Sequence, residues 1–172
     1  SNNIAVGSAA LFNNKEGNYN IATGNNALHN NTDGSNNIAM GTNALYANTT
    51  GIQNVAIGAN SISVNTTGNY NVATGTEALQ SNTGSWNVAN GHQALKANTT
   101  GNSNIAIGAN SLGSNVGGSN NVAMGSSALQ ANKTGIQNIA IGEIALSNNV
   151  SGSGNVAIGY QTLFIGAAGS HN

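Results

Sequence analysis

The sequence predicts an all-β protein, a parallel β-solenoid (β-roll) of ten coils with one coil in each 17-residue repeat. Three observations support this: a regular internal repeat, strand-like alternation of aliphatic residues, and glycine and asparagine at fixed places between them. A short fixed period is typical of solenoids, in which each unit buries its apolar side only against its neighbours. Ten coils at about 4.8 Å each would make a rod roughly 48 Å long.

The repeat accounts for residues 1–172 as a single array with no domain boundary. Numbered from its first aliphatic residue, each repeat has Ile or Val at position 1, Ala at 2, Gly at 4 and 14, Leu or Ile at 8, and Asn at 17. Position 11 is Asn in nine repeats, and one repeat is a residue short near Thr83 and Gly84. We interpret the chain as a segment of a longer protein, because it begins on the tail of a further repeat without an initiator Met. The repeats begin at residues 4, 21, 38, 55, 72, 88, 105, 122, 139 and 156.

Each repeat predicts two short strands joined by two corners. Positions 17 to 3 alternate like a strand, and positions 7 to 10 predict a second strand on the other side of the coil. The glycines at positions 4 and 14 are expected to supply backbone angles that other residues avoid. A helical repeat is disfavoured, since 17 residues are too few for a helix pair and the fixed Gly and Asn would weaken helices.

Alternation along the first strand assigns its two faces. We expect position 1 to face inward against the Leu or Ile at position 8, with position 3 at the margin of the core. The alanine at position 2 would then face outward, although alanine is a poor strand former. Either the second layer of the same coil or another chain must pack against it, and we favour another chain. The predicted inter-chain face comprises Ala22, Ala39, Ala56, Ala73 and Ala106.

The two asparagine columns predict ladders of hydrogen bonds. Identical amides stacked one coil apart can bond to one another along the rod and to the turn backbone. The alternative is a row of amides that binds glycans.

The composition excludes several classes of function. Only 4% of residues are charged, the net charge is −1, and the three lysines are scattered, which argues against binding nucleic acid. Cysteine is absent, which excludes disulfides and cysteine metal sites. No apolar run approaches the ~18 residues of a membrane span, so we expect no membrane insertion by this segment.

A catalytic site needs titratable groups that converge, and the repeat keeps them apart. His29, His92 and His171 fall in coils 2, 6 and 10. We therefore predict no enzyme, no cofactor and no metal; the alternative is one histidine meeting its own copies on a trimer axis.

Six of the seven aromatic residues fall at two positions of the repeat. Tyr46 stands at position 9, and Tyr19, Tyr70 and Trp86 stand at position 16. Aromatic rings at edges can stack on sugars, so these four are the candidate receptor contacts. The alternative is that they cover corners between coils or between chains.

Several motifs resemble known fibre proteins. Gly159–Leu163, Asn54–Gly58 and Ala47–Gly51 resemble the Asn/Gly-rich repeats of bacteriophage and phage-like tail fibres. The element Asn54–Gly58 also resembles the head repeats of trimeric autotransporter adhesins, which are left-handed parallel β-rolls. The resemblance implies a homotrimeric attachment fibre, extracellular, on a cell surface or on a virion. For such a fibre segment, weak contacts of the exposed loops with a cell-surface glycan are the expected partner interaction. The 17-residue period is longer than that of adhesin heads, and stalk, anchor and chaperone domains are absent from this sequence.

Three functions follow as expectations. The first is a non-enzymatic fibre segment for attachment to a host or surface. The second is an ice-binding solenoid, which the broken threonine columns disfavour. The third is a subunit of a purely structural extracellular filament.

Overall fold

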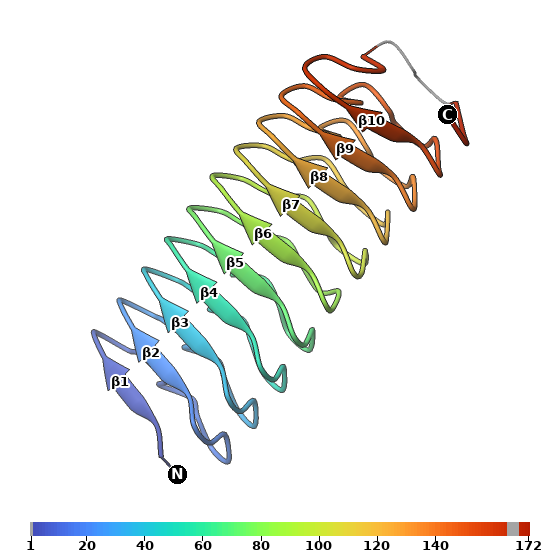
Figure 1. The fold of residues 1–172 in the computed structure, drawn as a ribbon. Coiled ribbons are helices and arrows are strands. Elements are labelled where there is room, and N and C mark those ends of the chain that lie inside the picture. The colour runs from blue at the N-terminus through green and yellow to red at the C-terminus, as the bar shows by residue number, and fades with distance from the viewer. Residues whose placement is uncertain (1, 165–168) are drawn as a thin grey trace.

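The computed structural model describes residues 2–164 and 169–172, and it confirms the all-β solenoid. Ten three-residue strands lie side by side in one parallel sheet, in chain order, and the described residues contain no helix (Figure 1). Each strand starts at position 1 of its repeat. The strands are Ile4–Val6 (β1), Ile21–Thr23 (β2), Ile38–Met40 (β3), Val55–Ile57 (β4), Val72–Thr74 (β5), Val88–Asn90 (β6), Ile105–Ile107 (β7), Val122–Met124 (β8), Ile139–Ile141 (β9) and Val156–Ile158 (β10).

The strands pair in strict register, so each residue lies beside its equivalent one repeat later. Ala5 pairs with Ala22, and the register holds across the short repeat, where Val72 pairs with Val88. The missing residue is absorbed in the corner near Gly84, where the Asn82 amide reaches the Gly84 carbonyl across one residue fewer than its equivalents. A corner can absorb the deletion because it carries no strand register.

The alternation along each strand is as predicted, but the assignment of its faces was wrong. The alanine at position 2 faces inward and is fully buried within the single chain from β2 to β9, whereas positions 1 and 3 face outward. The five alanines predicted to face another chain therefore lie in the core of one coil. These are Ala22, Ala39, Ala56, Ala73 and Ala106.

The core is thin and made of three aliphatic columns. The alanines at position 2 pack with the small residues at position 7 and with the leucine or isoleucine at position 8, such as Leu28, Ile62 and Leu79. Alanine suits position 2 because the position 8 side chain already fills the narrow space between the two walls. The larger residues at position 1 would overfill it, which is the physical reason for the reversed faces.

The return segment is not the second strand predicted for positions 7 to 10. Backbone φ is positive at positions 6 and 8, with values of 55° at Asn26 and 51° at Leu28. Amides alternate in direction: Leu28 N donates to Ala44 O of the next coil at 3.0 Å, and His29 N donates to Asn26 O of its own coil at 3.3 Å. A left-handed leucine costs of order 1–3 kcal/mol, which its full burial offsets by contributing roughly 1.5–3 kcal/mol.

The two glycine columns have different causes. Gly75 at position 4 has φ +136°, and an added Cβ would lie 2.6 Å from the Gly91 carbonyl oxygen, so both conformation and space require glycine. Position 14 was expected to need unusual angles, but its glycines do not adopt positive φ. An added Cβ at Gly51 would instead collide with the Asn48 amide and with the carbonyl oxygen of Gly68.

The predicted asparagine ladders are confirmed and buried. At position 17, Asn37 Nδ2 donates to Gly51 O at 2.8 Å, and Asn37 Oδ1 accepts the backbone amide of Asn54 at 2.9 Å. At position 11, Asn48 Nδ2 donates to Asn31 Oδ1 at 2.7 Å. The ladders satisfy backbone groups that the three-residue strands leave unpaired.

The second ladder ends where the repeat changes. Asn149 Oδ1 is the one buried side-chain polar atom without a partner among the described residues. Position 11 of the tenth repeat is Gly166, which lies outside those residues and has no side-chain amide to donate.

We expect core substitutions to unfold the coil rather than to alter assembly. Ala73→Leu should cost about 1–3 kcal/mol by overpacking, and Leu79→Ala about 2–5 kcal/mol by leaving a cavity. Gln80→Ala, next to Leu79 but partly exposed, is the control and should change the free energy of unfolding by less than about 0.5 kcal/mol. Urea unfolding followed by circular dichroism measures all three. An unchanged midpoint for Ala73→Leu would contradict the inward placement of position 2.

We also expect the position 17 ladder to contribute strongly to stability. Asn104→Leu keeps the side-chain volume but removes the donor to Gly118 O and the acceptor of the Asn121 backbone amide. Each buried polar group left unpaired costs about 1–3 kcal/mol. Asn25→Leu, at an exposed corner, is the matched control. Equal midpoints of unfolding for the two variants would show that the ladder is not a stabilising element.

Candidate functional site

The outer face of the sheet is an uncharged and mostly aliphatic surface. It consists of the side chains at positions 1 and 3 of each repeat, and we call it the sheet face. Its members include Ile57, Ile105, Ile107 and Ile139, each between 38% and 39% exposed. No residue of the sheet face is charged, and Thr23, Thr74 and Asn90 are its only polar members. An exposed apolar surface that follows the whole rod is a candidate binding surface.

A second feature is a short aromatic stack on the return segment, at position 9 of coils 1 to 3. The Phe12 and His29 rings stack with centroids 5.3 Å apart at 12°, and the His29 and Tyr46 rings stack at 5.3 Å and 24°. Stacking is possible because the coils place equivalent side chains about one strand spacing apart. The stack ends at Tyr46, because position 9 of coil 4 is Ser63.

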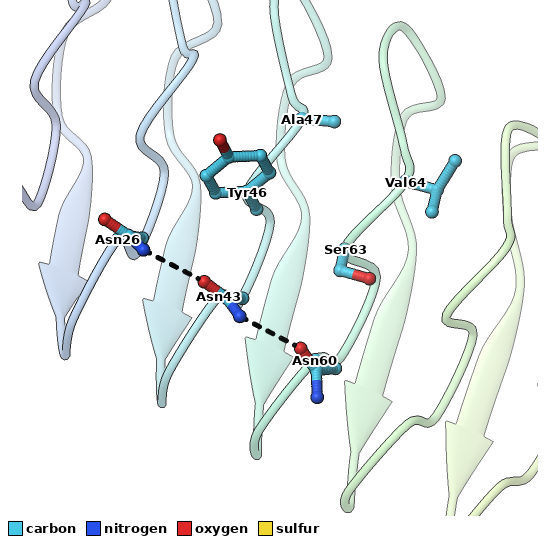
Figure 2. A pocket seen from close by; sticks show the side chains of 7 residues that line it. All are labelled: Asn26, Asn43, Tyr46, Ala47, Asn60, Ser63 and Val64. Carbon is cyan, nitrogen blue, oxygen red and sulfur yellow. Dashed lines mark hydrogen bonds between the residues drawn. The ribbon is translucent and has the colours of Figure 1, made fainter.

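A pocket of about 390 Å³ opens where the stack ends. Tyr46 and Ala47 line it from coil 3, and Ser63 and Val64 line it from coil 4 (Figure 2). Along its edge runs a chain of amides: Asn26 Nδ2 donates to Asn43 Oδ1, and Asn43 Nδ2 donates to Asn60 Oδ1, both at 3.2 Å. The lining carries no charge, so the pocket combines an aromatic ring with neutral donors and acceptors.

The structure brings together two of the three candidate residues at position 16. The Tyr70 and Trp86 rings stack with centroids 4.0 Å apart at 13°, and Trp86 is 58% exposed. Tyr19 lies three coils before Tyr70 and is exposed on its own. Tyr46 lies on the return segment, apart from these three. The four candidate receptor contacts therefore form three separate places rather than one site.

Positions 6 and 15 have no constant residue in the sequence, and the structure gives both a role. Position 6 has positive φ in every coil, which suits the asparagines of the amide chain beside the pocket. At position 15, a Ser or Asn side chain accepts a backbone amide of the preceding coil, as Ser85 Oγ does from Asn69 N at 3.0 Å. The signal was present, since position 15 is Ser or Asn in eight repeats and Ile only at Ile52 and Ile136.

The charged groups form one ion pair in the part of the chain that the structure describes. Lys96 Nζ lies 2.8 Å from Glu77 Oε2, and Gln93 Nε2 donates to the same oxygen at 2.8 Å. These contacts, first that of Lys96 and then that of Gln93, lower the pKa of the Glu77 carboxyl. The pair joins neighbouring coils on the solvent-exposed surface.

The described residues include no group of three or more His, Asp or Glu side chains that could hold a metal ion. The three histidines lie in separate coils, and His29 takes part in the aromatic stack. Within the described ranges, no helix has the length and apolar character needed to cross a bilayer.

The chain matches no protein-family model, no curated protein and no solved structure.

The pKa of Glu77 gives a test of the inter-coil pair. Lys96→Met should raise the pKa of Glu77 toward its ordinary value, as measured by carboxyl carbon NMR during a pH titration. Because the folded pKa lies below the unfolded one, the stabilisation is present above the unfolded pKa and is lost as pH falls through the folded pKa. Lys133→Met is the control and should leave the Glu77 titration unchanged. An unshifted titration in Lys96→Met would show that the pair does not persist in solution.

Proposed function

We propose that this chain is a non-enzymatic segment of an attachment fibre, a rigid rod that associates with further copies of itself through the sheet face. The observation that carries the proposal is the uncharged, mostly aliphatic surface along the rod. At about 4.8 Å per strand and about 3.3 Å per residue, its flat footprint is on the order of 500 Å². That size is comparable with the largest apolar patch of a typical monomer, and such patches are often functional.

A second copy of the chain fits this surface better than an unrelated partner. The side chains of the sheet face repeat once per strand spacing, and only a partner with the same period can match them along the whole rod. Parallel copies have that period by construction, and the absence of charge means that no like charges meet. Resemblance to trimeric fibres favours three copies over two.

The proposed assembly leaves the return segment exposed. The aromatic stack and the pocket lie on the wall opposite the sheet, so covering the sheet face does not cover them. In such a fibre the variable side chains would face outward, while the interior would stay the same from coil to coil. The fibre itself would be extracellular, on a cell surface or on a virion. The same geometry would serve a purely structural filament if no receptor binds.

Ice binding receives less support. The threonines at position 12 direct their hydroxyls to the next coil, as Thr49 Oγ1 does to Thr66 O at 2.9 Å and Thr83 Oγ1 to Thr99 O at 2.8 Å. Those hydroxyl protons are not free to bind an ice lattice. The sheet face has threonine in only two coils.

The test is the oligomeric state of the array and of charge variants. Native mass spectrometry with light scattering should give a trimer for the unchanged chain. The double variant Ile105→Lys and Ile139→Lys should be monomeric with an unchanged circular dichroism spectrum, because both side chains face outward and desolvating a lysine against an apolar face is unfavourable. Gln130→Lys, an exposed substitution on the return segment, is the control and should stay trimeric.

Two outcomes would contradict the proposal. A monomer for the unchanged chain at micromolar concentration would remove self-association. A trimer that survives both lysines would show that the copies meet through another surface.

A further inference from the structure

We propose that the pocket beside Tyr46 binds one neutral hexopyranose ring of a glycan. This inference deepens the proposed function, because it names the class of receptor that the fibre would contact. It rests on the ring geometry, the free polar group and the charge of the lining.

The interrupted stack provides the platform. His29 covers one face of the Tyr46 ring, and the two rings are nearly parallel. The other face therefore points toward coil 4, where Ser63 stands in place of a fourth ring. The space is large enough for a ring-sized ligand, since about 390 Å³ lies within the roughly 300–1,000 Å³ of ligand pockets. The apolar C–H face of a pyranose can occupy the position of the missing ring and pack on the tyrosine.

The polar groups around the platform suit hydroxyls. The described structure gives Asn60 Nδ2 and Ser63 Oγ no hydrogen-bond partner within the protein, although Asn60 Oδ1 accepts from Asn43. The Ser63 hydroxyl offers a donor and an acceptor beside the ring site. Figure 2 shows that the Asn43 bond holds the Asn60 amide with its Nδ2 directed away from Tyr46, so Asn60 lines the edge of the pocket and the serine is the free polar group.

The charge of the lining selects among sugars. None of the seven lining residues is Asp, Glu, Lys, Arg or His. A sialic or uronic acid would bring a carboxylate without a cationic partner. A neutral hexose therefore fits the pocket, and a flat aromatic compound would leave Ser63 unpaired.

The experiment uses the full chain and defined probes. A glycan array carrying glucose-, galactose- and mannose-terminated oligosaccharides, with sialylated and glucuronic-acid oligosaccharides as comparators, identifies a bound sugar. Saturation-transfer NMR with the methyl glycoside of that sugar, and with indole as the aromatic comparator, then measures affinity. We expect binding of at least one neutral sugar and weaker binding of the acidic sugars and of indole.

Three variants locate the site. Tyr46→Ala removes the platform and Ser63→Phe completes the aromatic stack, so each should weaken sugar binding at least tenfold. Ser63→Phe adds a stacked ring and should not destabilise the fold, which separates loss of the site from loss of structure. Tyr19→Ala removes an exposed ring outside the pocket and should bind as the unchanged chain does.

Failure of this inference is distinguishable from failure of the proposed function. No neutral sugar bound, binding unchanged in Ser63→Phe, or preference for indole or acidic sugars would each overturn the inference, while a trimer would still support the fibre. A monomer that binds sugar with the expected variant pattern would overturn the assembly and uphold the site.

Discussion

The structure depends on one constraint: every coil must present the same hydrogen-bonding and packing groups to the next coil, one strand spacing further along the rod. The position 17 asparagine shows how this is met. Its Nδ2 donates to the carbonyl of the next corner, and its Oδ1 accepts the amide of the next asparagine, as Asn37 does with Gly51 and Asn54. With three-residue strands, few backbone groups can pair within the sheet alone, so the side-chain ladder completes the pairing.

The ladder also explains the small residues around it. The amides occupy the space beside the position 14 glycines, where a Cβ would collide with them. The leucine at position 8 fills the remaining space, and it does so from a left-handed backbone whose strain its burial offsets. Interior positions therefore tolerate little change, whereas the outer positions can vary without affecting the coil.

This division between a constant interior and a variable surface is consistent with the proposed role of the chain as a fibre segment. A uniform interior makes a rod, the sheet face supplies one uncharged and mostly aliphatic side, and the return segment carries side chains that differ more from coil to coil. Because equivalent side chains of neighbouring coils stack on one another, those differences create local surface features. Three successive aromatic or imidazole rings form a column, and the serine that follows leaves a ring-sized pocket. A site can thus arise in a solenoid from a single change in one column.

The sequence by itself determined the ten coils, the all-β class, the alternation along the strand and the two asparagine ladders. These features follow from the 17-residue period, which is visible in the sequence because each coil places its residues in the same environment. The sequence also indicated which face of the strand is buried, and our interpretation of that signal was wrong. Ala at position 2 and Asn at position 17 never change, whereas position 3 accepts Thr23 and Asn90, and such constancy marks the crowded interior.

Only the tertiary structure decided which way the faces point, how the return segment runs, and where the pocket lies. Strand alternation is symmetric, so it separates two faces without saying which one is inside. Which face is buried is decided by the space that remains between the sheet and the return segment once Leu79 and its equivalents are in place. The left-handed leucines could not be foreseen, because the isolated residue disfavours that backbone and only burial across the coil makes it favourable. The pocket needed the structure for the same reason, since Tyr46, Asn60 and Ser63 meet only when neighbouring coils stack.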